Sequence, residues 1–253
     1  MPKALFTDTS KCIGCRGCQV ACKQWHGLPA EKTQFWGSYE NPKALTAFTW
    51  RRVKFVEARG NGRVRWSFMS DNCKHCTDAS CLAVCPTGAI FRRASGAVDI
   101  NQNLCNGCRY CVSACPFGVI SFNAETGRVN KCIFCPERVE NGLAPACATT
   151  CPTGAISFGE RGDLMAKAKA RLEEVKKGGF PEARIYGETE LSGLHSFYLL
   201  TRPPEAYGLP EKPKYAIASV FPDSAWSVAG ALAIGVGAVV GFRERGRAAR
   251  EEG

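Results

Sequence analysis

Residues 105–116 read Cys105-Asn-Gly-Cys108-Arg-Tyr-Cys111-Val-Ser-Ala-Cys115-Pro116. The four thiols stand at intervals of three, three and four residues, and a proline follows the last of them. Three cysteines at intervals of three let a tight loop wrap one side of an iron–sulfur cube, whereas the fourth, on the following helical turn, points away. The proline then ends the helix. The stretch therefore predicts a cluster-binding loop that needs a partner loop.

The sixteen cysteines of the chain all fall into four such sets. The first set is Cys12, Cys15, Cys18 and Cys22, and the second is Cys73, Cys76, Cys81 and Cys85. The third lies in residues 105–116, and the fourth is Cys132, Cys135, Cys147 and Cys151. Because no cysteine is left over, we expect four [4Fe-4S] clusters held by cysteine alone.

Disulfides or zinc sites could also use sixteen cysteines. Disulfide-rich scaffolds are usually much shorter than this chain and rarely place thiols in triplets. Zinc sites use pairs of Cys-x2-Cys hairpins, whereas two sets here contain Cys-x2-Cys-x2-Cys and three end in Cys-Pro. We therefore favour iron–sulfur clusters over zinc, and zinc over disulfides.

The length and charge of the chain narrow the possible functions. Its 253 residues, 45% of them hydrophobic, suit one or two globular domains. The formal net charge of +10 would suit a nucleic-acid-binding protein. However, each cluster with its four thiolates carries about two negative charges, which brings the loaded protein near neutrality. The basic residues are also scattered, so we expect no nucleic-acid partner.

The pairing of the sets follows from the fourth cysteines. In two-cluster ferredoxins, the fourth cysteine of each loop ligates the cluster of the other loop. The second and third sets adjoin in the sequence and should exchange their fourth cysteines, which leaves the first and fourth sets to exchange theirs. The predicted ligands are Cys12, Cys15, Cys18 and Cys151 for cluster A; Cys132, Cys135, Cys147 and Cys22 for cluster B; Cys73, Cys76, Cys81 and Cys115 for cluster C; and Cys105, Cys108, Cys111 and Cys85 for cluster D.

Three segments that follow cysteine sets are near-copies of one another. They begin at Cys85-Pro-Thr-Gly-Ala-Ile, Cys115-Pro-Phe-Gly-Val-Ile and Cys151-Pro-Thr-Gly-Ala-Ile. Each predicts a helix stop, a glycine turn and a short strand. We therefore predict an α+β fold with two ferredoxin-like units, each binding two [4Fe-4S] clusters, one inserted in the other, plus a single C-terminal transmembrane helix.

The predicted domains follow from this arrangement. They are an outer ferredoxin-like domain of residues 1–22 and 123–160, an insertion with a β-hairpin at 23–72, an inner ferredoxin-like domain at 73–122, a helix–strand extension and linker at 161–224, a transmembrane helix at 225–242 and a basic tail at 243–253. Alternation of apolar and polar residues places the hairpin strands at 50–57 and 63–69 and further strands at 4–8, 183–186 and 194–201. A helix should run from Asp163 to about Lys177, and the proline-rich residues 202–214 should be extended.

The segment Ala225–Phe242 contains eighteen residues and no charge. As a helix it would be about 27 Å long, against about 30 Å for the hydrocarbon layer of a bilayer. A buried helix of a soluble protein is the alternative, but four glycines and a terminal position favour a single-pass membrane anchor. Four arginines follow the segment, so we expect a cytoplasmic C-terminus and the cluster-bearing body on the periplasmic face. No export signal is visible near Met1, which predicts export together with a partner.

Three stretches together resemble the iron–sulfur beta subunits of membrane-bound formate dehydrogenases. They read Cys12-Ile-Gly-Cys15-Arg-Gly-Cys18-Gln-Val-Ala-Cys22-Lys-Gln-Trp-His-Gly, Pro145-Ala-Cys147-Ala-Thr-Thr-Cys151-Pro-Thr-Gly-Ala-Ile, and Gly193-Leu-His-Ser-Phe-Tyr-Leu-Leu followed by Tyr207-Gly-Leu-Pro. The resemblance covers nearly the whole chain. The cysteine pattern alone is shared with beta subunits of nitrate, dimethyl sulfoxide and polysulfide reductases and of some hydrogenases, so the formate assignment depends on the flanking segments.

This resemblance implies an electron-transfer subunit with no catalytic centre of its own. It would relay electrons from a formate-oxidising alpha subunit with a molybdenum or tungsten bis-pterin cofactor to a membrane cytochrome b gamma subunit and the quinone pool. The alternatives are the equivalent subunit of another respiratory oxidoreductase and, more remotely, a zinc-dependent nucleic-acid-binding protein.

Several polar residues beside the cysteines could adjust the clusters. A nearby cation stabilises the extra negative charge of a reduced cluster and so raises its reduction potential. The candidates are Lys11, Arg16, Lys23, Lys74, Arg109 and Lys131, each of which could equally be ordinary surface charge. We assign no iron to His26, His75 or His195, because a histidine ligand would leave a cysteine unused.

Overall fold

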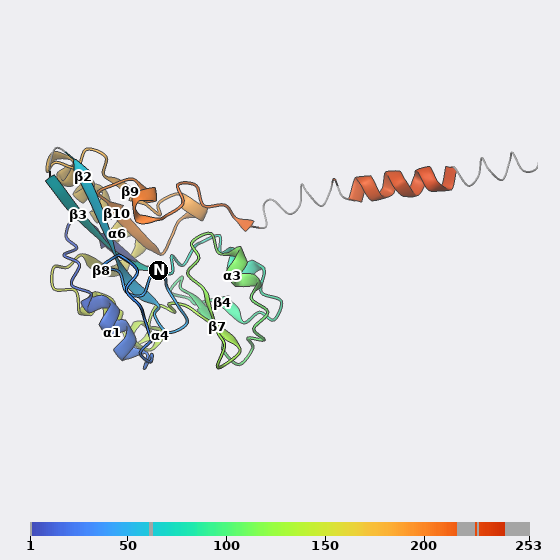
Figure 1. Ribbon diagram of the computed structural model, residues 1–253, viewed down its shortest axis with the longest axis horizontal. Coiled ribbons are helices and arrows are strands. Elements are labelled where there is room, and N and C mark those ends of the chain that lie inside the picture. The colour runs from blue at the N-terminus through green and yellow to red at the C-terminus, as the bar shows by residue number, and fades with distance from the viewer. Residues whose placement is uncertain (1, 61–62, 217–225, 227, 241–253) are drawn as a thin grey trace, which may run out of the picture. The chain divides into compact units, whose positions relative to one another are not determined.

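The computed structural model describes residues 2–60, 63–216, 226 and 228–240 (Figure 1). The chain divides into two units, Met1–Tyr215 and Ala216–Gly253. The first unit contains a four-stranded sheet in the order β8 (Ile156–Glu160), β1 (Lys3–Asp8), β10 (Ser196–Leu200) and β9 (Arg184–Tyr186). Strand β1 runs parallel to β10 and antiparallel to β8, and β9 runs antiparallel to β10. All residues of β10 are buried, as expected for a strand that is covered on both faces.

Helix α6 (Arg161–Lys177) packs on this sheet. Its buried residues Leu164, Met165 and Ala168 join a core with Phe6 and Phe197. They recur at helical spacing, which is why this segment folds as a helix with one apolar face. The helix begins two residues before the predicted Asp163, which lies in the first turn, where a carboxylate favours the helix dipole.

The predicted hairpin is present and is longer than the sequence indicated. Strands β2 (Arg51–Gly60) and β3 (Arg63–Asn72) pair antiparallel, with Arg51 opposite Asn72 at the base. The base of the hairpin is buried, whereas Glu57 and residues 64–66, further along it, are exposed. Since the residues at the base carry charged side chains into the interior, the alternation pattern did not reveal where the strands end.

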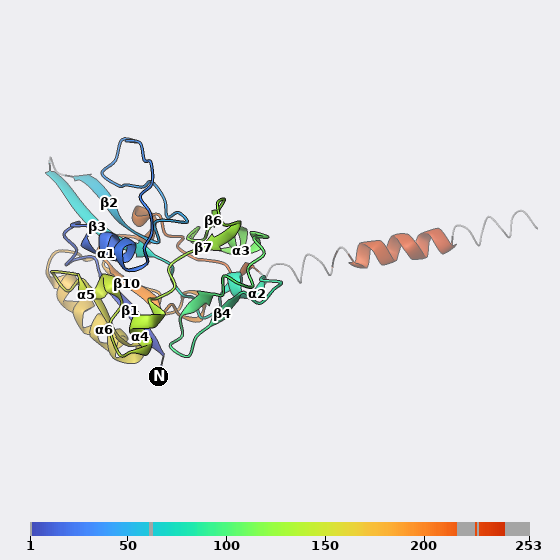
Figure 2. The same ribbon diagram turned by 90° about the horizontal axis from the view of Figure 1, so that it is seen from below.

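The cysteine sets are carried by short helices and two-stranded sheets. Strand β4 (Ile90–Arg92) pairs with β5 (Val98–Ile100), and β6 (Ser121–Asn123) pairs with β7 (Arg128–Asn130). The short helices are α1 (Gly17–Trp25), α2 (Ser80–Ala83), α3 (Tyr110–Ala114), α4 (Pro136–Glu140) and α5 (Ala146–Thr149). Helix α1 contacts α5, and α2 contacts α3. Figures 1 and 2 both show α3, β4 and β7 together on one side of this unit, away from α1 and α6.

Residues 202–214 do not form the extended linker that their prolines indicated. The segment contains a short 3-10 helix, η2 (Pro204–Tyr207). Another, η1 (Glu190–Ser192), precedes strand β10. Tyr207 and Leu209 are buried in the core beside the sheet, and the Tyr207 hydroxyl hydrogen-bonds with the Thr201 hydroxyl at 2.9 Å. Burial of these side chains therefore overrides the local preference of proline for extended backbone.

In the second unit, residues 228–240 form a helix with exposed side chains. Part of the predicted transmembrane helix, 225–242, and all of the predicted tail, 243–253, lie outside the described residues. Among the helices of the part that is described, none has both the length and the apolar character needed to span a bilayer.

Candidate metal centres

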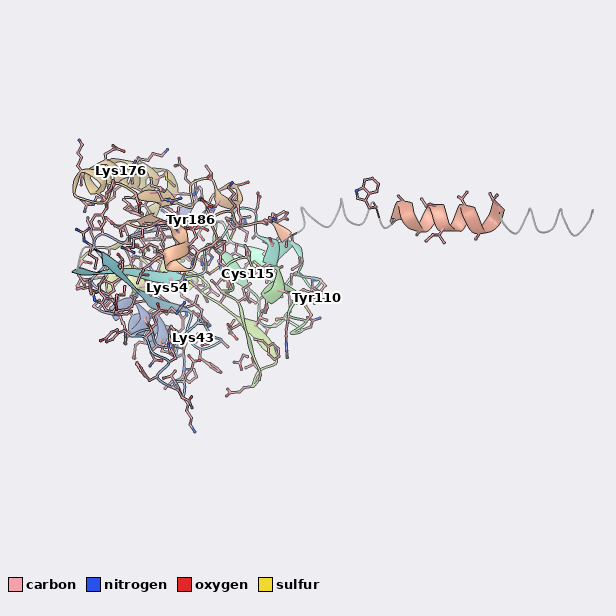
Figure 3. The ribbon with its side chains drawn as sticks, turned by 45° about the horizontal axis from the view of Figure 1, so that its top comes forward. Lys43, Lys54, Tyr110, Cys115, Lys176 and Tyr186 are labelled. Carbon is pink, nitrogen blue, oxygen red and sulfur yellow. The ribbon has the colours of Figure 1, made fainter. Side chains whose placement is uncertain are left out.

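Three spaces in the first unit are each lined by four cysteines. One is lined by Cys73, Cys76, Cys81 and Cys115, a second by Cys85, Cys105, Cys108 and Cys111, and a third by Cys12, Cys15, Cys18 and Cys151. Each space combines three cysteines of one set with the fourth cysteine of another. Cys115, which directly follows α3 and is labelled with Tyr110 in Figure 3, crosses in this way.

The remaining four cysteines are Cys22, Cys132, Cys135 and Cys147, and all of them are buried. Burial raises the pKa of the Cys22 thiol well above its ordinary value, and its neighbours Cys132, Cys147 and Cys135 raise it further. Nε2 of His26 lies 3.4 Å from Sγ of Cys135. These four thiols therefore lie together as well, although Cys22 is more than a hundred residues away from the others in the sequence.

A left-handed backbone conformation recurs in all four loops. The residue before the second cysteine of each set has a positive φ, and these residues are Gly14, His75, Gly107 and Phe134, with φ of 71°, 47°, 73° and 74°. Such a residue reverses the local direction of the chain, which lets the thiols on either side of it face one space. Glycine adopts this conformation freely, but His75 and Phe134 adopt it at a cost of about 1–3 kcal/mol.

The chemistry of the thiols suits metal ligation. None of the sixteen cysteines is in a disulfide. Among the described residues, no three His, Cys, Asp or Glu side chains are close enough to hold a single metal ion. The cysteines instead line spaces between them, as ligands of a larger metal cluster would. Burial is the main cause that raises the pKa of Cys12 to about 11 and that of Cys135 to about 12. These thiols are therefore neutral at neutral pH until a metal displaces the proton.

Thiols of neighbouring groups also affect one another. Burial is the main cause of each raised pKa, but Cys18 also raises that of Cys147, and Cys132 also raises that of Cys73. In the same way, burial is the main cause of the raised pKa of Cys81, and Cys111 raises it further. These interactions join the cysteines predicted for clusters A and B, B and C, and C and D. Groups A and B, B and C, and C and D are therefore close enough for their thiols to interact.

Two of the six cations singled out in the sequence are fully buried. Lys131 donates from Nζ to the carbonyl oxygens of Val98 and Cys132. Lys74 pairs with Asp71 and also donates to the Asn72 carbonyl at 2.7 Å. The remaining four, Lys11, Arg16, Lys23 and Arg109, are partly or fully exposed.

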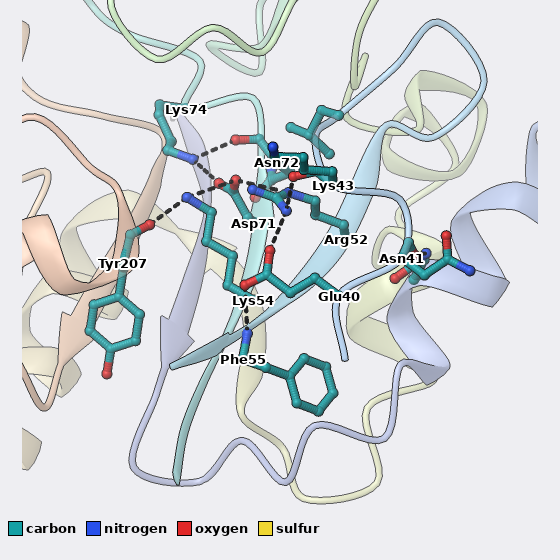
Figure 4. A network of polar contacts seen from close by, with 12 residues as sticks. Glu40, Asn41, Lys43, Arg52, Lys54, Phe55, Asp71, Asn72, Lys74 and Tyr207 are labelled. Carbon is teal, nitrogen blue, oxygen red and sulfur yellow. Dashed lines mark hydrogen bonds and ion pairs between the residues drawn. The ribbon is translucent and has the colours of Figure 1, made fainter. Parts of the chain in front are cut away.

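Asp71 is the centre of a buried network of charges (Figure 4). Besides Lys74, its carboxylate lies 3.6 Å from Nζ of Lys54 and 4.0 Å from Nε of Arg52. Burial alone would raise the pKa of Asp71, but these three cations lower it to about 2. The carboxylate is therefore ionised throughout the neutral range and holds the base of the hairpin against the second cysteine loop.

The three histidines have structural contacts. Nδ1 of the buried His75 accepts a hydrogen bond from the Val98 amide at 3.0 Å. Burial is the main cause that lowers its pKa, so the ring is neutral. Nδ1 of His195 lies 2.9 Å from the carbonyl oxygen of Lys3, and His26 packs on the ring of Trp50. His75 and His195 use their rings to join segments of the fold.

Sequence reasoning missed Arg51, which is 1% exposed and lies at the base of the hairpin. Its Nη1 donates to Oγ of Ser70 at 2.8 Å, and this oxygen lies 3.1 Å from Sγ of Cys18. Burial alone would lower the pKa of Arg51, but the thiols of Cys147, Cys18 and Cys132 raise it. No cysteine lies within twenty residues of Arg51 in the sequence, so spacing gave no signal for it.

Comparison with known proteins identifies the kind of metal centre that these loops build. Residues 11–89 and 64–161 each match a family described as a 4Fe-4S dicluster domain. The chain is 42% identical over 215 residues to the nitrate-inducible formate dehydrogenase iron-sulfur subunit of Escherichia coli, covering 83% of this chain and 73% of that protein. The chain belongs to the iron–sulfur subunits of formate dehydrogenases. It is an electron-transfer component, as its resemblance to the family predicted.

Other formate dehydrogenase subunits show similar identity. The formate dehydrogenase-O iron-sulfur subunit of Escherichia coli is 38% identical over 227 residues, which cover 88% of this chain and 76% of that protein. Formate dehydrogenase 2 subunit beta (cytochrome c-553) of Nitratidesulfovibrio vulgaris is 37% identical over 216 residues, which cover 82% of this chain and 97% of that protein. The two dicluster matches together cover residues 11–161, the part of the chain that carries all four cysteine sets.

Proposed function

We propose that this subunit relays electrons, one at a time, through four [4Fe-4S] clusters from a formate-oxidising catalytic subunit to a membrane acceptor. The grouping of the thiols supports this proposal, because each group of four contains three cysteines of one loop and one cysteine of another loop. Four such groups match the number of clusters that two dicluster domains bind.

The ligands of these clusters are the sets predicted from the sequence. Cys151 completes cluster A, Cys22 completes cluster B, Cys115 completes cluster C and Cys85 completes cluster D. When bound, a cluster supplies a one-electron redox couple. The chain itself supplies the thiolates, excludes water from the buried sulfurs and places cations and hydrogen-bond donors beside them.

The electron donor and acceptor are inferred from the family and the sequence. The donor is a catalytic alpha subunit with a molybdenum or tungsten bis-pterin cofactor, and the acceptor is a membrane cytochrome b gamma subunit that passes electrons to quinone. Residues 225–242 anchor the subunit in the membrane as a single helix, with the cluster-bearing body on the periplasmic face after export with the catalytic subunit. The uncharged segment and the four arginines behind it support this arrangement.

The proposal is tested on the complex purified from membranes under anaerobic conditions. Addition of formate should reduce the clusters of this subunit, seen as new electron paramagnetic resonance signals, and a quinone analogue should reoxidise them. Metal analysis should find at least about sixteen iron atoms per copy of this chain, the number that its four clusters contain. If dithionite reduces the clusters but formate does not, the proposed donor is wrong. If the chain contains zinc in place of iron, the relay itself is wrong.

A further inference from the structure

Arg51 is a buried cation with no carboxylate partner in the part of the chain that the structure describes. Burial of an unpaired guanidinium costs several kcal/mol, so a buried arginine normally has an acidic neighbour. The closest parallel is Lys74, which is equally buried and pairs with Asp71. Among the described residues, Nη2 of Arg51 has no hydrogen-bond partner at all. Something other than a side-chain carboxylate must therefore balance its charge.

The groups that face Arg51 are cysteine thiols of two neighbouring clusters. In the hairpin, Arg51 stands opposite Asn72, whose Nδ2 lies 3.9 Å from Sγ of Cys132 of cluster B. Burial alone would lower the pKa of Arg51, but negative charge on Cys147 and Cys132 of cluster B and on Cys18 of cluster A raises it. Burial raises the pKa of Cys22 and Cys135 of cluster B, and the charge of Arg51 opposes both rises. The guanidinium thus interacts with all four cysteines of cluster B but with one cysteine of cluster A.

The contact with cluster A passes through Ser70. Because Nη1 of Arg51 donates to Oγ of Ser70 at 2.8 Å, the serine hydroxyl is free to donate to Sγ of Cys18, 3.1 Å away. A positive charge behind a hydroxyl donor polarises it and strengthens the second hydrogen bond. Hydrogen bonds to cluster sulfur are one of the means by which a protein sets a cluster's potential.

We propose that Arg51 is a positioning residue that raises the reduction potentials of clusters A and B, acting on B through its charge and on A mainly through Ser70. This inference depends on the proposed four-cluster function. Reduction moves one electron from the preceding donor of the relay into a cluster; no bond forms or breaks, and no proton moves. The reduced cluster carries one more negative charge, which the fixed guanidinium stabilises at short range in a buried site.

The test is a redox titration of all four clusters in the loaded complex, followed by electron paramagnetic resonance. Arg51→Met should lower the midpoint potentials of clusters A and B, with the larger shift at B, and leave C and D unchanged. Ser70→Ala should lower that of cluster A alone. Lys169→Met is the matched control, because it removes the same charge from an exposed ion pair with Glu188 and should shift none of the four.

The variant Arg51→Lys keeps the charge and covers the case in which Arg51→Met does not assemble. It should leave the midpoint potential of cluster B nearly unchanged but lower that of cluster A, because the lysine ammonium does not reproduce the geometry of the hydrogen bond from the guanidinium to Ser70. Unchanged potentials in Ser70→Ala and Arg51→Lys, or equal shifts of all four clusters, would overturn the inference. Absence of iron from the wild-type chain would instead refute the proposed function.

Discussion

At the level of single residues, Asp71 shows how buried charge stabilises this fold. Asp71→Asn would leave Lys74 buried without a counter-ion, so we expect the free energy of unfolding to fall by about 3–5 kcal/mol. Because the pKa of Asp71 is lowered to about 2 from an ordinary 3.8, its contribution is present above the ordinary pKa and is lost as the pH falls through about 2. The destabilisation should therefore be constant from about pH 5 to about pH 8.

Chemical denaturation of the loaded protein measures this effect. Glu188→Gln is the control, because it breaks the exposed ion pair with Lys169 and should cost less than about 1 kcal/mol. Equal effects of the two substitutions would mean that the Asp71 network does not stabilise the protein.

Gly107 illustrates the steric demands of a cluster loop. It has φ of +73°, and a Cβ there would lie 2.0 Å from the carbonyl oxygen of Gly127, in the turn between β6 and β7. Gly118 has a similar φ of +59°, but a Cβ there would meet nothing within 4 Å. Both alanine variants carry the backbone strain of about 1–2 kcal/mol, and only Gly107→Ala adds a clash.

We therefore expect Gly107→Ala to be less stable than Gly118→Ala by about 1–3 kcal/mol. It should also lose the cluster held by the flanking Cys105 and Cys108, which iron analysis and thermal unfolding would show together. A Gly107→Ala protein as stable and as rich in iron as Gly118→Ala would contradict the proposed fit between this loop and the turn.

At the level of elements, two adjoining loops exchange one cysteine each. If each loop gives its fourth cysteine to the cluster of the other loop, Cys115→Ser should change the same spectroscopic signal as Cys76→Ser, because both thiols line one space. Cys85→Ser should change the same signal as Cys108→Ser. The comparison uses electron paramagnetic resonance spectra of the four variants after full reduction. If Cys115→Ser and Cys108→Ser share a signal, each loop binds its own fourth cysteine and the exchange is wrong.

Elements whose signal is local could be predicted from the sequence. The cysteine loops, the strands β1, β9 and β10, and helix α6 depend on spacing or periodicity within a few residues, and each lies within a few residues of its predicted position. Gly14 and Gly107 could also be expected in turns. The local sequence does not predict a positive φ at His75 or Phe134. Contacts between distant segments accompany it, such as the packing of these two rings, whose centroids are 4.7 Å apart.

Features that depend on distant contacts could not be predicted in this way. Arg51 and Lys54 carry charged side chains, which are usually exposed, and only the folded chain shows that they are buried. The segment that contains Tyr207 was predicted to be a linker because of its prolines. Its burial depends on contacts with the distant sheet, which the local sequence does not show. The charges that surround the cysteine groups were therefore recognised only in part.

At the level of the whole molecule, the four cysteine groups are linked in neighbouring pairs. The interactions between them run from A to B, from B to C and from C to D, all within the unit Met1–Tyr215. The loops form two pairs. The first and fourth cysteine sets make the outer pair, since α1 contacts α5, and the second and third sets make the inner pair, since α2 contacts α3. Under the proposed relay, we expect the loss of cluster B or cluster C to block electron transfer from formate to the membrane acceptor.

The position of β1 between β8 and β10 also sets an order of events during synthesis. Strand β1 is synthesised more than 140 residues before its partners Ile156–Glu160 and Ser196–Leu200. The loops of the second and third sets contact one another and can close as soon as residue 130 is free. We therefore expect the middle of the chain to fold before strand β1 finds its partners, so that the loops of the second and third sets close ahead of those of the first and fourth.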